Sequence, residues 1–165
     1  MTAAALLLAL VTAERLAELW LAHRNTAALL AKGAVEVAAG HYPLIVALHA
    51  VWLGALWVLG AGAVVQPGWL ALFLLLQAAR VWVLATLGPR WTTRIIILSG
   101  APLITTGPYR WLSHPNYVVV VAEIAVLPLC LGLPAVAVIF SLANAAVLTL
   151  RITAENAALR PRPAR

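Results

Sequence analysis

Five long apolar stretches constrain what this chain can fold into more than any other feature. They cover residues 3–22, 42–60, 68–87, 117–131 and 134–150, which is more than half of the 165 residues. A helix of about 20 apolar residues crosses the ~30 Å hydrocarbon core of a bilayer. Only 10% of the residues are charged, against roughly 25% in an ordinary soluble domain, so a soluble fold could not bury this much apolar surface. The sequence therefore predicts an all-α integral membrane bundle with five transmembrane helices.

The connections between these stretches indicate how the helices are joined. The last two stretches are separated only by "GLP" at 132–134, so they are expected to form a tight helical hairpin. Pro128 should bend or end the fourth helix, because proline interrupts helical hydrogen bonding. No Lys or Arg precedes the first stretch, which is therefore predicted to be a spanning helix and not a signal peptide. A single membrane-embedded domain is expected over residues 1–165, with a flexible tail at 160–165.

The basic residues outside the apolar stretches fall in alternate connections. They occupy the first connection, the third connection and the C-terminal segment, as Arg24, Lys32, Arg90, Arg94, Arg110, Arg151, Arg160, Arg162 and Arg165. Basic connections stay on the cytosolic side of a membrane, so the N-terminus is predicted outside and the C-terminus in the cytosol. The net charge of +6 is then explained by contact with anionic lipid, and no nucleic-acid partner is expected.

Several ionisable side chains lie inside the predicted spans, where an unpaired charge is costly. Glu14 and Glu18 belong to the first span, and Arg80 belongs to the third. These residues are expected to form buried ion pairs that join helices, for instance between Arg80 and either glutamate. Arg151 and Glu155 lie four residues apart on one helical face, where the fifth helix leaves the membrane. Their position beside the motif described next favours a functional role for this second pair.

Polar and backbone-constraining residues gather in one segment, "TTGPYRWLSHPNYVVVV" at 105–121. Ser113 is a good helix cap and Pro115 is tolerated in a first helical turn, so the segment is predicted to start the fourth helix. A helix start also offers free N–H groups to an anion, and His114 and Tyr117 would flank such a site.

Two further residues of the segment suit the binding of a small polar molecule. Arg110 could add a cation, and Gly107 permits a tight turn with close backbone approach. Such a site fits a carboxylate-bearing cofactor at the cytosolic surface, above an apolar bundle that admits a lipid-like tail. No metal site is expected, because the chain has four histidines without Asp, and Cys130 is its one cysteine.

Two segments of the chain resemble a known family. "LITTGPYRWLSHPNY" at 103–117, followed by a helical hairpin and "RITAENAAL" at 151–159, looks like the isoprenylcysteine carboxyl methyltransferase family of integral membrane enzymes. "GAVEVAAGHYPLIVALHAVW" at 33–52 is similar to the first half of the small bacterial members. The resemblance implies S-adenosylmethionine as methyl donor, with S-adenosylhomocysteine as product. It also implies a bacterial cytoplasmic membrane, with the active site facing the cytosol.

The resemblance implies roles for individual residues of this chain. The donor site would be formed by Gly107, Tyr109, Arg110, His114, Pro115, Asn116, Tyr117 and Glu155. Catalytic roles are expected for His114 or His41 as a base and for Arg151. Two positions depart from the family pattern, because Ser113 stands where Arg is usual and Asn156 where a second Glu is common.

The missing arginine at position 113 weakens the case for a prenylcysteine carboxylate as methyl acceptor. The preferred acceptor is therefore a hydroxyl of an alkylpyrone or alkylresorcinol, as bacterial relatives suggest. Carboxyl methylation of an isoprenylcysteine-type substrate and N-methylation of a phospholipid are the alternatives. A small membrane transporter or scaffold is the non-enzymatic alternative. The expected partners are a lipophilic small molecule and membrane lipid, and the oligomeric state is left open.

Overall fold

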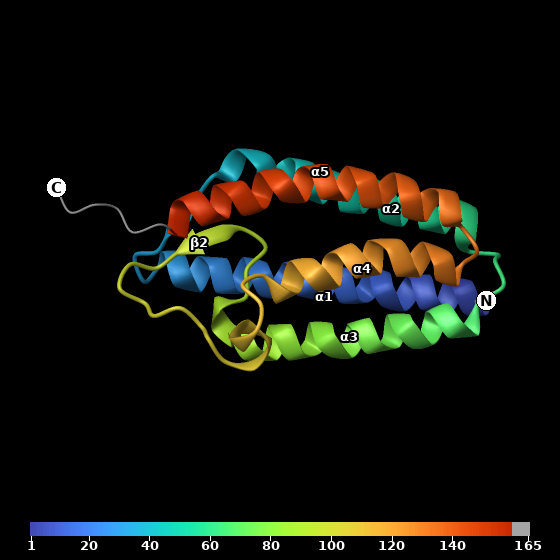
Figure 1. Ribbon diagram of the computed structural model, residues 1–165, viewed down its shortest axis with the longest axis horizontal. Helices are drawn as coiled ribbons and strands as arrows, with labels where there is room; N and C mark the ends of the chain where they lie inside the picture. The colour runs from blue at the N-terminus through green and yellow to red at the C-terminus, as the bar shows by residue number, and fades with distance from the viewer. Residues whose placement is uncertain (160–165) are drawn as a thin grey trace.

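The computed structural model describes residues 1–159, except for the side chains of His41, Asn156, Ala158 and Leu159. The tail predicted to be flexible, at 160–165, lies outside the described residues. Five long helices run side by side in one bundle (Figure 1). They are α1 (Ala3–Leu30), α2 (Tyr42–Gly60), α3 (Pro67–Leu87), α4 (Pro115–Cys130) and α5 (Pro134–Leu159). The predicted helical bundle, with its tight hairpin between the last two helices, is confirmed.

Three of these helices, α2, α3 and α5, are long and apolar enough to cross a membrane. The helix α1 is long enough, but Glu14, Arg15 and Glu18 interrupt its apolar surface. The helix α4 is apolar but has only 16 residues. The chain is an integral membrane protein by these helices, and the crossing by all five helices stays a prediction.

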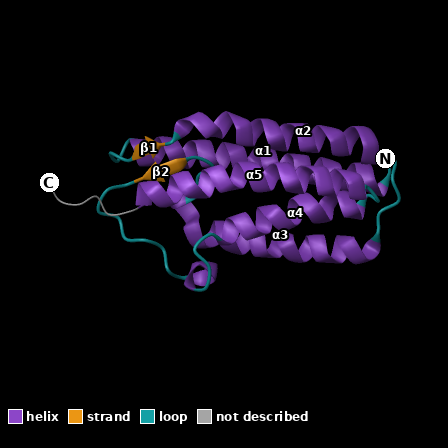
Figure 2. Cartoon of the chain, turned by 45° about the horizontal axis from the view of Figure 1, so that its top comes forward, coloured by secondary structure: helices purple, strands orange, loops and turns teal. Residues whose placement is uncertain are grey.

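The two ends of the bundle differ. One end carries the long connections, with β1 (Val35–Val37), η1 (Ala39–His41), η2 (Gly88–Arg90), β2 (Ile95–Ile97) and η3 (Gly107–Arg110). The strands β1 and β2 pair antiparallel, with Glu36 opposite Ile96 (Figure 2). At the other end, short turns join α2 to α3 and α4 to α5 (Figure 1). The first connection, the third connection and the end of α5 therefore meet at one end, which we call the loop end.

Two helices continue beyond the apolar stretches that predicted them. The helix α1 runs on to Leu30 because Asn25 is buried and donates to the carbonyl oxygens of Gly88 at 3.2 Å and Trp91 at 2.9 Å. The helix α5 runs on to Leu159. The apolar runs predicted where these helices lie, but not how far they extend toward the loop end.

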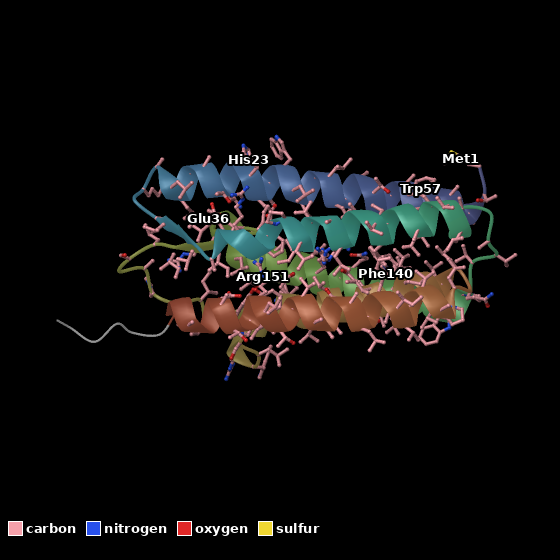
Figure 3. The ribbon with its side chains drawn as sticks, turned by 90° about the horizontal axis from the view of Figure 1, so that it is seen from above. Met1, His23, Glu36, Trp57, Phe140 and Arg151 are labelled. Carbon is pink, nitrogen blue, oxygen red and sulfur yellow. The ribbon has the colours of Figure 1, made fainter. Side chains whose placement is uncertain are left out.

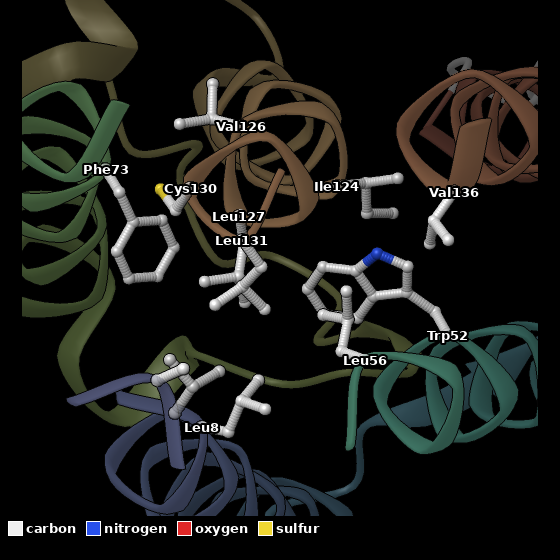
Figure 4. Close-up of a cluster of buried hydrophobic side chains, with 12 residues drawn as sticks. Leu8, Trp52, Leu56, Phe73, Ile124, Val126, Leu127, Cys130, Leu131 and Val136 are labelled. Atoms are coloured by element: carbon white, nitrogen blue, oxygen red, sulfur yellow. The ribbon is translucent and has the colours of Figure 1, made fainter. Parts of the chain in front are cut away.

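An apolar core fills the half of the bundle away from the loop end. Leu8 of α1, Trp52 of α2, Phe73 of α3 and Leu127 of α4 meet there, as Figure 4 shows. Pro128 lies in the last turn of α4, where its carbonyl oxygen accepts from the backbone N–H groups of residues 131 and 133. As predicted, α4 ends close to this proline, at Cys130.

A buried ion cluster of Arg15, Glu18, Arg80 and Glu123 lies between the apolar core and the loop end. Arg80 of α3 donates to Glu18 of α1 and Glu123 of α4, each through a contact of 2.6 Å. Arg15 donates to the same two carboxylates at 3.1 and 2.9 Å. The amide group of Gln77 is oriented so that its nitrogen faces the cluster, and this nitrogen donates to Glu123 Oε1 at 3.1 Å. The expected ion pair between the first and third helices is confirmed, and it includes the fourth helix.

Candidate active site

A second polar cluster lies at the loop end and centres on the hydroxyl group of Tyr117. Arg151 of α5 donates its Nε–H to this oxygen at 2.7 Å, and the hydroxyl donates to the carboxylate of Glu155. The ring of His114 stacks on Tyr117, with centroids 5.1 Å apart, and its Nδ1 lies 3.9 Å from Glu155 Oε2. We call these four residues the Tyr117 cluster. It joins the first turn of α4 to the last turns of α5.

The start of α4 explains how these side chains come together. Pro115 occupies the first helical turn, where its missing N–H has no helical partner to lose. His114 is the N-cap residue and makes no side-chain capping bond. The prediction that Ser113 caps the helix is wrong, because Ser113 lies before the cap position and is exposed. The ring of His114 is instead available to stack on Tyr117.

A cavity of about 570 Å³ opens beside the Tyr117 cluster, and we call it the outer cavity. Its walls come from β2, the segment that follows β2, η3, and the facing ends of α4 and α5. Polar residues in these walls include Thr92, Arg94, His114, Tyr117, Arg151 and Glu155. Its volume lies in the range of about 300–1,000 Å³ that is usual for small-molecule sites.

A second cavity of about 280 Å³, the inner cavity, lies deeper in the bundle. Apolar side chains from α1, α2, α4 and α5 form most of its wall, among them Leu19, Ile45, Leu53 and Val120. The two cavities share a wall made of Trp91, Thr92, Asn116, Tyr117 and Arg151. Arg151 points from α5 into the bundle (Figure 3). The outer cavity is therefore the more polar of the two, and the cavities meet at the Tyr117 cluster.

Two buried atoms in this shared wall have no hydrogen-bond partner among the described residues. They are Asn116 Oδ1 and Trp91 Nε1. An unsatisfied buried polar atom costs about 1–3 kcal/mol, so native proteins rarely keep one unless water or a ligand pairs with it. The shared wall is thus suited to a bound polar group.

The structure brings together most of the residues expected to form the site. Tyr109, His114, Asn116, Tyr117, Arg151 and Glu155 all line the outer cavity. Burial raises the pKa of Tyr109 to about 12, and the charge of Glu155 adds to this effect. The Tyr109 hydroxyl therefore stays protonated at neutral pH and can donate a hydrogen bond.

Four expected residues lie elsewhere or are not described. Gly107, Arg110 and Pro115 line neither cavity, and Arg110 is exposed. Gly107 has φ +55°, and a Cβ there would lie 2.5 Å from Thr86 Oγ1, so a glycine lets η3 pack against α3. The side chain of His41 lies outside the described part of the structure.

Sequence reasoning missed two residues of the shared wall, Trp91 and Thr92. Neither belongs to a recognisable motif. The position of Trp91 depends on its backbone carbonyl, which accepts from Asn25 of α1 at 2.9 Å. A contact between residues so far apart in the chain leaves no local pattern to find.

Comparison with known proteins assigns the chain to a family. The model of the isoprenylcysteine carboxyl methyltransferase (ICMT) family matches residues 69–161, more than half of the sequence. This chain belongs to the ICMT family. The resemblance seen in the motif at 103–117 is thereby confirmed.

The ICMT family match runs from α3 to α5 and includes the Tyr117 cluster. "Uncharacterized protein YpbQ" of Bacillus subtilis (strain 168) is 35% identical over 168 residues, covering 94% of this chain and 95% of that protein. No solved structure matches the chain significantly. Membership makes the chain part of a family of membrane methyltransferases, whose general methyl donor is S-adenosylmethionine.

Proposed function

We propose that this chain is a membrane methyltransferase that transfers the methyl group of S-adenosylmethionine to an oxygen of a lipophilic small molecule. One observation carries the proposal beyond family membership. A polar outer cavity and an apolar inner cavity share a wall that contains Asn116, Tyr117 and Arg151. A reaction between a polar donor and a lipophilic acceptor needs such a meeting point. Residues 1–159 contribute to this arrangement from all five helices, which supports one methyltransferase domain over residues 1–165.

The outer cavity fits the methyl donor by its volume and by the charge of its wall. Glu155 offers a carboxylate to an ammonium group or to sugar hydroxyls, while Arg94 offers a cation to a carboxylate. Asn116 Oδ1 is a buried acceptor that still needs a partner. When bound, S-adenosylmethionine supplies an electrophilic methyl group on a sulfonium. The protein then has to align the two reactants and keep water out.

The inner cavity fits the acceptor, and its charges favour a hydroxyl head group. Arg15 and Arg80 are already paired with Glu18 and Glu123. A buried carboxylate without a cationic partner costs several kcal/mol. A phenol or enol enters as a neutral group, so we prefer an alkylresorcinol-like or alkylpyrone-like acceptor.

Carboxyl methylation of an isoprenylcysteine-type substrate is the second candidate, because it is the activity in the family name. Arg151 favours it, because this cation lies in the shared wall. The one hydrogen bond that it makes within the described part of the chain is the one from its Nε–H to Tyr117. Its guanidinium group is the one we expect to hold an acceptor carboxylate.

The same proposal includes five membrane spans, with the N-terminus outside and the loop end in the cytosol of a bacterial cell. This orientation is supported by Arg24, near the end of α1, and by four basic residues in the connections at the loop end, Lys32, Arg90, Arg94 and Arg110. Single cysteines introduced near Arg94 would test it in intact cells. Labelling by an impermeant reagent added from outside would contradict a cytosolic loop end.

Incubation of the purified protein with labelled S-adenosylmethionine and a lipid extract tests the activity. We expect label in a lipophilic product that carries a new O-methyl group. A long-chain resorcinol and a farnesylcysteine analogue of matched tail length should then be compared, so that tail burial of about 0.8 kcal/mol per CH₂ cancels. Faster methylation of the carboxylate by tenfold would favour the second candidate. A protein that binds no S-adenosylmethionine would favour the transporter or scaffold.

A further inference from the structure

We propose that His49 of α2 accepts the proton of the acceptor hydroxyl during methyl transfer, and that the acceptor is therefore a weakly acidic hydroxyl compound. The inference rests on the proposed function and assigns a new residue to it. His49 lines the inner cavity, as do Tyr117 and Arg151 of the Tyr117 cluster. It lies within the segment at 33–52 that resembles the small bacterial members of the family, but outside the motif at 103–117.

The hydrogen bonds of His49 define which ring nitrogen is available. Its Nδ1 lies 2.8 Å from the carbonyl oxygen of Ile45, one turn earlier in α2. A carbonyl oxygen only accepts, so Nδ1 carries the proton and donates it. In the neutral ring, Nε2 then bears the lone pair. Among the described residues, no hydrogen bond to this Nε2 is found.

The surroundings hold the ring and indicate that a polar group binds beside it. Trp52 contacts the ring edge to face, with centroids 6.4 Å apart. Trp52 Nε1 and Asn144 Nδ2 are buried donors without a partner in the described part of the chain, and both residues line the inner cavity. Their side chains are more than nine-tenths buried, at 2% and 3% exposure. A mostly apolar cavity lined by His49, with two unpaired buried donors in its walls, is suited to a ring that carries an oxygen.

The proton transfer completes the chemistry of a hydroxyl acceptor. The acceptor oxygen forms a bond to the methyl carbon while the carbon–sulfur bond breaks and leaves its electron pair on sulfur. The O–H bond breaks at the same time, its electrons stay on oxygen, and the proton moves to His49 Nε2. The positive charge thus passes from sulfonium to imidazolium. Arg151, which lines the same inner cavity as His49, stabilises negative charge on the oxygen.

A carboxylate acceptor has no need of this base, because it loses its proton before it binds. The two candidate activities therefore respond differently to the loss of His49. General base catalysis contributes about 10²–10⁴-fold to a rate, so the difference is large enough to measure.

The test uses the full-length protein with His49→Asn and His49→Gln. Asparagine keeps a donor near the Ile45 carbonyl, while glutamine places a non-basic amide near the position of Nε2. His23→Asn is the matched control, because His23 is exposed, points away from the bundle and lines neither cavity (Figure 3). Affinity for S-adenosylmethionine, measured by calorimetry, reports whether each variant is folded.

We expect both His49 variants to methylate a long-chain resorcinol about a hundredfold more slowly or worse, with unchanged donor affinity. Transfer to a carboxylate acceptor with the same tail should change by no more than about threefold. Equal losses on both acceptors would show a structural role and overturn the proposal. Resorcinol methylation at the wild-type rate in either variant would also overturn it. Wild-type protein that methylates neither acceptor would instead refute the proposed function.

Discussion

The buried ion cluster and the Tyr117 cluster use similar residues for different purposes. Each joins helices through arginine and glutamate side chains. In the buried ion cluster, Arg80 and Glu123 are 5% and 2% exposed, and the charges satisfy one another. In the Tyr117 cluster, the side chains of His114 and Glu155 are 22% and 24% exposed and face the outer cavity. Both clusters border a cavity, but the charges of the buried ion cluster are satisfied by one another, whereas the more exposed groups of the Tyr117 cluster can also bind a ligand.

Breaking the buried ion cluster should produce the largest effect. Arg80→Ala leaves Arg15 as the one ion-pair partner of Glu18 and Glu123 among the described residues. Loss of one partner of a buried ion pair costs about 3–5 kcal/mol, so the protein should melt at a clearly lower temperature. Thermal unfolding in detergent measures this. Arg110→Ala is the control, because Arg110 is exposed. Equal melting temperatures would mean that the cluster does not stabilise the bundle.

A change in the Tyr117 cluster should instead affect binding of the methyl donor. Glu155→Gln removes a charged acceptor that faces the outer cavity. A hydrogen bond to a charged group contributes about 1.5–3 kcal/mol, so donor affinity should fall by about 10- to 100-fold. Calorimetry with S-adenosylmethionine measures the loss, and the melting temperature should stay close to the wild-type value. Thr153→Ala is the control, since Thr153 lies on the same part of α5, is exposed and lines neither cavity. Unchanged affinity would remove Glu155 from the site.

His114→Ala should have a smaller effect in the same direction. The variant loses the stacked contact with Tyr117, whose rings lie 5.1 Å apart. Aromatic pairs contribute about 0.5–1.5 kcal/mol beyond burial, so donor affinity should fall by about two- to tenfold. His114→Phe keeps a ring that can stack and should recover most of the affinity. If phenylalanine fails to restore binding, a polar atom of His114 is what the donor requires.

The smallest effect is expected at the β1–β2 pair, which lies outside both clusters. Glu36 accepts from Arg94 at 3.0 Å, and this contact raises the pKa of Arg94. Arg94 is 43% exposed, so solvent screens the pair. Exposed ion pairs contribute about 0.2–1 kcal/mol, and Glu36→Ala should lower the unfolding free energy by no more than that. A larger loss in chemical denaturation would show that the paired strands are a major source of stability.

The sequence predicted the elements whose signals are local. The run at 42–60 became α2 with the same bounds, because an uninterrupted apolar stretch is both a span and a helix. The helix α1 continues past the predicted span at 3–22, because polar residues at 23–26 interrupt the apolar run while Asn25 makes long-range bonds. The three-residue strands β1 and β2 are too short to show a periodic pattern, and they become strands only by pairing.

The site divides in the same way. Tyr117, Arg151 and Glu155 were found because they lie in or beside a motif rich in unusual residues. Glu123 lies inside the fourth predicted span, where an unpaired charge is costly. Its partner Arg80 could not be predicted, because the pair depends on the packing of α4 against α3. His49 lies in the segment at 33–52 that resembles the family, but that resemblance gave it no role. Its importance follows from one hydrogen bond and a cavity, which exist only in the folded chain.

The pairing of β1 with β2 bears on whether this enzyme can be divided. The family match begins at residue 69, yet β1 at Val35–Val37 is the strand that holds β2 beside the outer cavity. The inner cavity likewise takes much of its wall from α1 and α2. A fragment that starts at residue 69 would therefore lack β1 and the walls that α1 and α2 supply, and we expect it not to form the site on its own. The first two helices are therefore not a separable membrane anchor, because they form part of the cavity itself.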